Sequence, residues 1–68
     1  MDGETLYVFD VTLKPILAKH MPNALKFSVV APEMREAINL ALGLAFKHGE
    51  GRIAYHVTEV KLYAKVGA

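Results

Sequence analysis

The sequence contains no cysteine and no tryptophan, and only three prolines and five glycines in 68 residues. Without cysteine, no disulfide can stabilise the fold and no thiolate can bind a metal ion. A chain of this length forms one domain, residues 1–68, and such a domain buries only about 60% of the surface that its unfolded state exposes. Self-association is another common way to stabilise so small a scaffold, so the missing cysteines favour an oligomer.

A strong charge of either sign is also missing. Eight lysines and arginines oppose seven acidic residues, which leaves a net charge of +1, so bulk charge gives no support to a nucleic-acid-binding role. No apolar run approaches the ~18–20 residues of a membrane span, and the N-terminal residues MDGETLYVF lack the basic segment of a signal peptide. We therefore expect a cytoplasmic protein that does not associate with membranes.

Apolar residues, in contrast, make up 53% of the chain. Residues 32–48 contain the one long helical pattern. Pro32 suits the first helical position, Glu33 and Lys47 complement the helix dipole at the two ends, and Gly49 is expected to supply the left-handed residue that closes the helix.

The apolar surface of this helix is wider than one small sheet can cover. A central stripe is formed by Met34, Ala37, Ile38, Ala41 and Ala45. Two leucines widen the stripe on one side, Leu40 and Leu44, and Leu42 and Phe46 widen it on the other. The resulting apolar arc is roughly 240°, against the ~100° needed to cover one core. Either the chain's own loops cover the surplus, or one flank contacts another subunit or a partner.

Three further segments predict strands, at residues 5–14, 24–31 and 52–66. In the first strand Tyr7, Phe9, Val11 and Leu13 fall on one face and are expected to face the helix. The other face is partly apolar at Leu6 and Val8 and polar from Asp10 onward. The predicted fold is therefore α+β in the order β-β-α-β: a three-stranded sheet with one helix on one face and a long C-terminal strand.

The last predicted strand changes phase along its length. Apolar residues occupy odd positions up to Val57 and even positions from Val60 onward, and one face cannot hold both sets without an irregularity. A bulge near Thr58–Glu59 would restore the phase. Alternatively, the two halves pack on opposite faces, or the C-terminal half pairs with another chain.

Segment 15–23 joins the first two strands and carries three apolar residues, Ile16, Leu17 and Met21. It either folds over the end of the core or contacts a partner, since long loops are often functional. The expected interface lies on the helix flank, on this segment or on the last strand. Its candidate residues are Leu40, Leu44, Ile16, Leu17, Met21, Val60, Leu62 and Val66.

Catalytic chemistry has no support in the sequence. The three histidines His20, His48 and His56 lie in different predicted elements without metal-ligand spacing, and the single serine, Ser28, lies within a strand. We expect no enzyme, no cofactor and no metal site.

These features predict a small non-enzymatic interaction module, which forms a homodimer or a higher oligomer and binds a protein partner. The alternative is a protein that binds single-stranded nucleic acid on the sheet face opposite the helix. That face would carry Lys14, Lys26, His56, Lys61, Tyr63 and Lys65.

Overall fold

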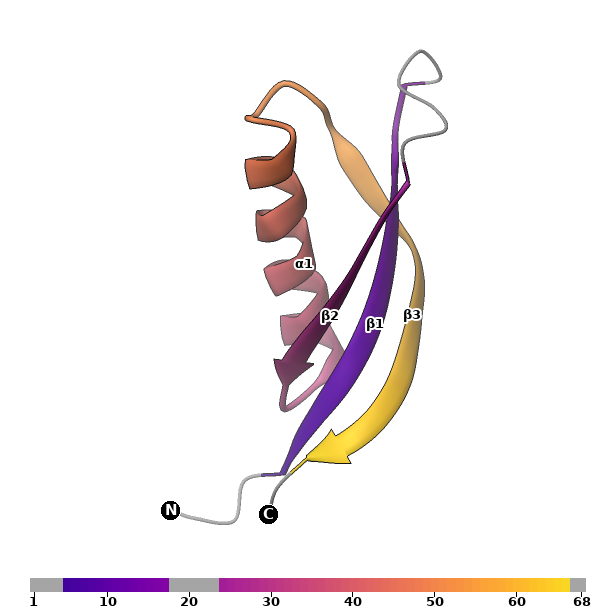
Figure 1. Cartoon of the computed structure of the whole chain (residues 1–68), viewed down its shortest axis with the longest axis vertical. Helices are drawn as coiled ribbons and strands as arrows, with labels where there is room; N and C mark the ends of the chain where they lie inside the picture. The colour runs from indigo at the N-terminus through magenta and orange to yellow at the C-terminus, as the bar shows by residue number, and fades with distance from the viewer. Residues whose placement is uncertain (1–4, 18–23, 67–68) are drawn as a thin grey trace.

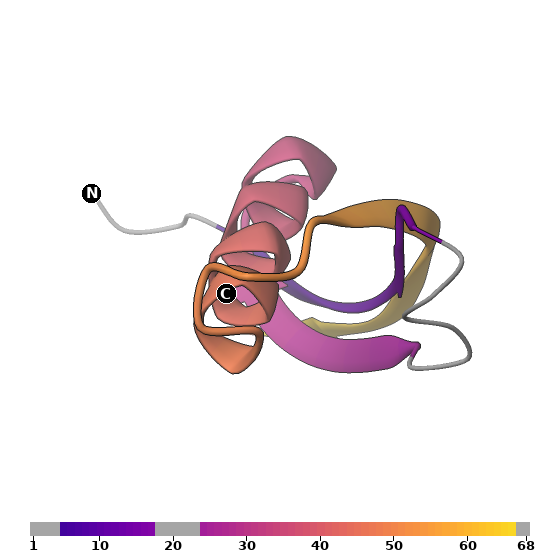
Figure 2. The same ribbon diagram turned by 90° about the horizontal axis from the view of Figure 1, so that it is seen from above.

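The computed structural model describes residues 5–17 and 24–66. Three strands and one helix follow one another along the chain: β1 (Leu6–Pro15), β2 (Leu25–Ala31), α1 (Met34–His48) and β3 (Tyr55–Val66). The strands form one antiparallel sheet in the order β2-β1-β3. The helix lies against one face of this sheet (Figure 1, Figure 2). The predicted α+β fold with β-β-α-β order is confirmed.

The central strand β1 alternates between the helix and the open face of the sheet. Phe9, Val11 and Leu13 are buried on the helix side, as the sequence predicted, and Tyr7 packs partly buried against the same core. Their antiparallel partners in β2 include Val29, opposite Phe9. The period of two residues in β1 therefore places one apolar row beneath the helix.

The buried core is small and its helical part consists of alanines. It comprises Phe9, Val11, Leu13, Val29, Ala31, Ala37, Ala41 and Ala45. Because alanine side chains are short, they contribute little apolar area to the core. The leucines of α1 lie on its flanks and not beneath it, so they remain at the surface.

The C-terminal end of α1 corrects one expectation. Gly49 has φ −87°, whereas Glu50 and Gly51 have the positive φ values of 54° and 71°. The backbone N–H of Gly51 donates a hydrogen bond to the carbonyl oxygen of Phe46, with an N···O distance of 3.0 Å. The backbone N–H of Glu50 donates a hydrogen bond to the carbonyl oxygen of Lys47, with an N···O distance of 3.1 Å. These two bonds form a Schellman motif in which Glu50, and not Gly49, is the left-handed residue. β3 consequently begins at Tyr55, three residues later than expected.

Two irregularities interrupt the pairing of β3 with β1. Thr12 pairs with Glu59 and Leu13 with Val57, so Thr58 is an extra residue. The predicted bulge near Thr58–Glu59 is confirmed, and it places Val60 on the helix side.

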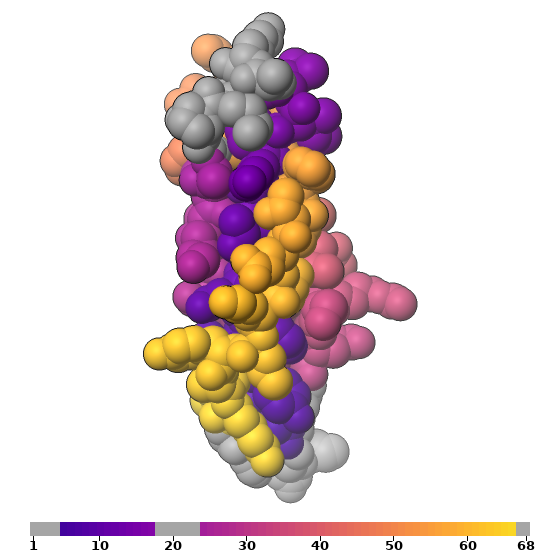
Figure 3. Space-filling model, turned by 90° about the vertical axis from the view of Figure 1, so that its right-hand side faces the viewer, coloured from indigo at the N-terminus to yellow at the C-terminus, as the bar shows by residue number. Residues whose placement is uncertain are grey.

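A second shift leaves Tyr63 unpaired, between Leu62, which pairs with Phe9, and Ala64, which pairs with Val8. This shift was not predicted, and it turns Ala64 and Val66 to the open face. Figure 3 shows that face, with β1 between β2 and β3. Since β3 pairs with β1 from Tyr55 to Val66, apart from Thr58 and Tyr63, its C-terminal half does not depend on another chain for pairing.

Candidate interaction surface

The helix has two exposed apolar flanks. On the flank toward β2, Leu40 is 50% exposed and Leu44 is 41% exposed. On the flank toward β3, Leu42 is 36% exposed and Phe46 is 65% exposed. Scattered apolar residues are normal on protein surfaces, but contiguous ones point to a binding surface.

The β2 flank forms a groove with the neighbouring strand. Two adjoining hollows of about 360 and 480 Å³ lie between α1 and β2 and share Val30, Asn39 and Leu40. Leu44 extends the groove along the helix. We call this surface the β2 groove; its lining residues are Val29, Val30, Ala31, Pro32, Glu36, Asn39, Leu40, Gly43, Leu44 and Lys47.

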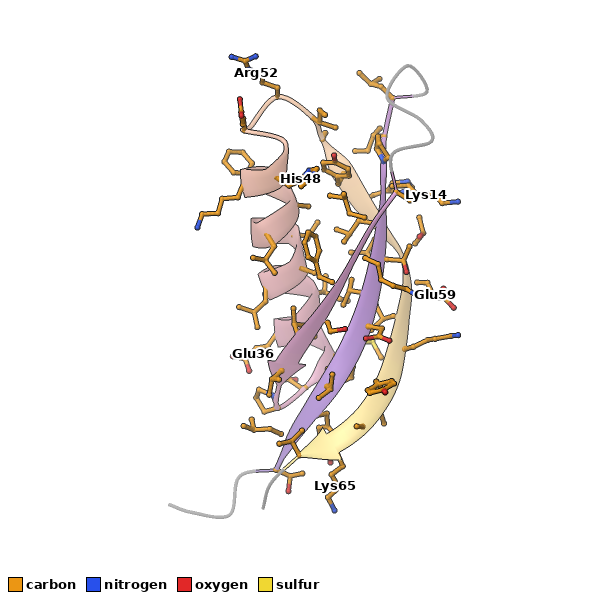
Figure 4. The ribbon with its side chains drawn as sticks, viewed as in Figure 1. Lys14, Glu36, His48, Arg52, Glu59 and Lys65 are labelled. Atoms are coloured by element: carbon orange, nitrogen blue, oxygen red, sulfur yellow. The ribbon has the colours of Figure 1, made fainter. Side chains whose placement is uncertain are left out.

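The charges of the β2 groove lie at its ends. Glu36, in the first turn of α1, lies at one end, and Lys47, in the last turn, lies at the other. Figure 4 shows Glu36 on the helix side of the molecule. The segment between them is mainly apolar, with one polar side chain, Asn39. The groove is therefore an apolar strip that is acidic at one end and basic at the other.

The wall of this groove is a free strand edge. β2 has one neighbour in the sheet, β1, and it pairs with β1 over seven consecutive residues without a bulge. In the described chain, no backbone hydrogen bond joins β2 to a segment outside the sheet. A strand of this kind presents a regular row of amides and carbonyls that another strand can pair with.

The other edge of the sheet is different. β3 contains two bulges and carries two lysines, Lys61 and Lys65, whereas β2 contains no bulge and one lysine, Lys26. Bulges twist an edge strand and lysines discourage pairing, so both features protect β3 against another chain. The two edges of this sheet are therefore unequal, and β2 is the one open to pairing.

A third, smaller hollow lies on the opposite flank of the helix. It measures about 260 Å³ between α1 and the start of β3, and its lining includes Leu42, Phe46, Ile53 and Tyr55. Leu42 and Phe46 were noted in the sequence as apolar but were not assigned to an interface. The width of the apolar arc on the helix indicated that both flanks are exposed, but it did not distinguish this flank from the one toward β2.

The predicted interface residues do not form one surface. Leu40 and Leu44 line the β2 groove, whereas Ile16 and Leu17 lie exposed just after β1. Met21 lies outside the described residues.

The three predicted interface residues of β3 differ from one another. Val60 packs partly buried against the core because the bulge at Thr58 turns it inward. Leu62 is exposed on the helix side of the sheet and Val66 is exposed on the open face. Val30, which is half exposed at the β2 edge, was not among the predicted interface residues.

The open face brings together part of the predicted basic set. The strand registers place Lys14, Lys26, His56 and Lys61 on this face. Lys65 pairs with Tyr7 and so lies on the helix side, and Tyr63 lies at the second bulge. In Figure 4, Lys14 points away from the helix, and Lys65 lies at the opposite end of the sheet from Lys14, near the C-terminal end of β3.

Acidic groups share the open face with these lysines. Asp10 pairs in register with Ser28 on one side and Lys61 on the other. The Ser28 hydroxyl donates a hydrogen bond of 2.7 Å to Asp10 Oδ1. Lys61 Nζ lies 3.9 Å from Glu59 Oε2, and Glu59 also points away from the helix (Figure 4). The face is thus of mixed charge.

The described residues contain neither a group of potential metal ligands nor a buried polar side chain. No three His, Asp or Glu side chains group closely enough to hold a metal ion in residues 5–17 and 24–66. Over the same part of the chain, no polar or charged side chain is buried. Nor is any helix described there long and apolar enough to cross a membrane.

The fold and its surface define a small α+β domain with an apolar groove beside a free strand edge. Comparisons with protein-family models, with curated proteins and with solved structures each find no match for the chain.

Proposed function

We propose that the chain is a small non-enzymatic interaction module that self-associates, as a homodimer or a higher oligomer, and binds a protein partner. The observation that carries the proposal is the β2 groove, in which Leu40 and Leu44 are about half exposed beside an open strand edge. Burying apolar surface is the main favourable term in most protein association. A domain with so small a core gains stability when a second chain covers this surface.

The remaining exposed apolar side chains offer room for a different partner. Leu42 and Phe46 border the hollow beside the start of β3, on the opposite flank from Leu40 and Leu44. Ile16 and Leu17 add apolar surface just after β1. If the β2 groove serves self-association, a protein partner can bind these surfaces at the same time.

Sedimentation velocity over a dilution series tests self-association. The proposal predicts a mass of at least twice the 7.5 kDa of the chain at micromolar concentration, falling on dilution. A species of 7.5 kDa at every concentration up to the millimolar range would refute it.

The second candidate function is binding of single-stranded nucleic acid by the open face. It is favoured by the register, which groups Lys14, Lys26, His56 and Lys61 on one surface. It predicts oligonucleotide binding that weakens as salt rises, because bound phosphates release counterions. Charge reversal at Lys61 should weaken binding more than reversal at Lys65, which lies on the other face. Equal effects, or no binding at low salt, would remove this candidate.

A further inference from the structure

The free edge of β2 and the apolar flank of α1 are parts of one continuous surface. Leu40 and Leu44 stand beside Val29 and Val30 along the groove. An added strand at the β2 edge would therefore satisfy backbone groups and cover apolar side chains at once. A strand added to an open sheet edge is a common mode of protein association.

The sequence of β2 is suited to pairing with a second copy of itself. In an antiparallel register centred on Ser28, all seven residues of the strand pair. Phe27 then opposes Val29 of the second copy, and Leu25 opposes Ala31, so a larger side chain meets a smaller one. Lys26 opposes Val30, so no two lysines face each other directly.

Neighbouring registers are less favourable. A shift by one residue would turn the helix-side residues of one copy to the open face of the other. A shift by two residues keeps the faces aligned but leaves only five of the seven residues paired. The register centred on Ser28 is therefore the one that pairs the whole strand with both helices on the same side.

The charges of the groove are also complementary in this arrangement. A two-fold axis makes the two helices antiparallel, so the end of one groove that carries Glu36 turns toward the end of the other that carries Lys47. Opposite charges then approach at both ends, with Leu40 and Leu44 of the two copies between them. An unrelated extended peptide offers no such match. The acidic end and the basic end thus favour a second copy as the occupant.

We propose that two copies join their β2 edges about a two-fold axis at Ser28. They form one six-stranded antiparallel sheet with both helices on one face and the two β2 grooves closed against each other. This inference rests on the proposed self-association and specifies its geometry.

The cysteine-free sequence allows a direct test by disulfide formation. Ser28 lies at the axis, so Ser28→Cys should give a covalent dimer under mild oxidation in most chains. Lys26→Cys alone should not, because its two copies lie about 13 Å apart along the strands, and a disulfide requires Cα atoms within about 7 Å. The same holds for Val30→Cys alone. A mixture of the Lys26→Cys and Val30→Cys chains should form a mixed dimer.

Lys61→Cys is the matched control, because it places an exposed cysteine on the same face but on β3. It should remain unlinked. A wild-type chain that is dimeric while Ser28→Cys fails to cross-link would overturn this inference and leave self-association standing. A monomeric wild-type chain would overturn both.

Hydrogen exchange on the unmodified chain provides a second measurement, since Ser28→Cys loses the bond to Asp10. The β2 amides that point away from β1 should exchange at least ten times faster on dilution below the dimer dissociation constant. The exchange rates of the β1 amides, which lie between two strands, should rise by much less than tenfold. Unchanged β2 exchange while the mass halves would contradict the proposal. So would a monomer whose β2 amides are protected only by an added apolar peptide.

Discussion

The substitution Leu44→Asp should break the dimer and leave the fold of the monomer intact. Leu44 is 41% exposed in the single chain, and full burial of a leucine contributes about 1.5–3 kcal/mol. Covering its exposed part therefore stabilises the dimer by roughly 0.6–1.2 kcal/mol per copy. Desolvating an aspartate there instead costs at least about 1–3 kcal/mol per copy. The two copies together lose about 3–8 kcal/mol, which raises the dissociation constant at least about 100-fold.

Leu42→Asp is a closely matched control for this experiment. Leu42 is 36% exposed, close to Leu44, and lies on the same helix but on the flank toward β3. Both substitutions carry the same small cost in helix propensity, so the comparison isolates the flank. Sedimentation equilibrium gives the dissociation constants and far-ultraviolet circular dichroism checks the helix. Equal weakening by the two substitutions, or dimerisation unaffected by Leu44→Asp, would refute the assignment of the β2 groove.

The remaining predictions concern stability, measured by urea denaturation at one fixed chain concentration. Leu13→Ala empties the centre of the core, where Leu13 is fully buried, and should cost about 2–5 kcal/mol. Gly51→Ala should cost about 1–2 kcal/mol, because φ is +71° and an added Cβ would lie 3.1 Å from Phe46 Cζ. Gly43→Ala should instead stabilise the single chain by up to about 1 kcal/mol, since the position is helical and open there. Because Gly43 lines the β2 groove, this variant is compared with the parent chain below the dimer dissociation constant. Glu50→Gly should stabilise by about 0.5–1 kcal/mol, because Glu50 has φ 54°. A reversed sign for any of these would contradict the structure given for the core, for the end of α1 or for the exposed face of α1.

Most of the fold follows from local patterns in the sequence. The period of two residues in β1 predicts its buried row, because Phe9, Val11 and Leu13 are apolar and the other face becomes polar from Asp10 onward. The phase change after Val57 predicts the bulge at Thr58, since no regular strand could bury both halves. The charges at the two ends predict the extent of α1 to within two residues. The helix begins at Met34, however, so Pro32 precedes the N-cap residue Glu33 and is not the first helical residue as expected.

The second bulge and the helix end were harder to predict. Tyr63 interrupts a run that reads as a regular alternation, and only the twisted pairing with β1 reveals the extra residue. Gly49 reads as a helix terminator, but it is buried where a Cβ would lie 3.2 Å from that of Ile53. Gly49 therefore leaves room for the side chain of Ile53, and Glu50 adopts the left-handed conformation. Neither the spatial constraint nor the twist can be inferred from neighbouring residues alone.

The candidate surface was predictable in part. The width of the apolar arc on α1 indicated surplus flanks, and Leu40 and Leu44 are exposed there. The arc alone could not show which flank adjoins a free strand edge. That depends on the strand order β2-β1-β3, which places β2 at the edge beside Leu40 and Leu44.

The most direct test of the central claim is an isotope-filtered nuclear Overhauser measurement on an equal mixture of labelled and unlabelled chains. If a second copy covers the β2 groove, the methyl groups of Leu40 and Leu44 will show contacts between chains, and those of Leu42 will not. Contacts between chains confined to Leu42 and Phe46, or none at millimolar concentration, would contradict the account.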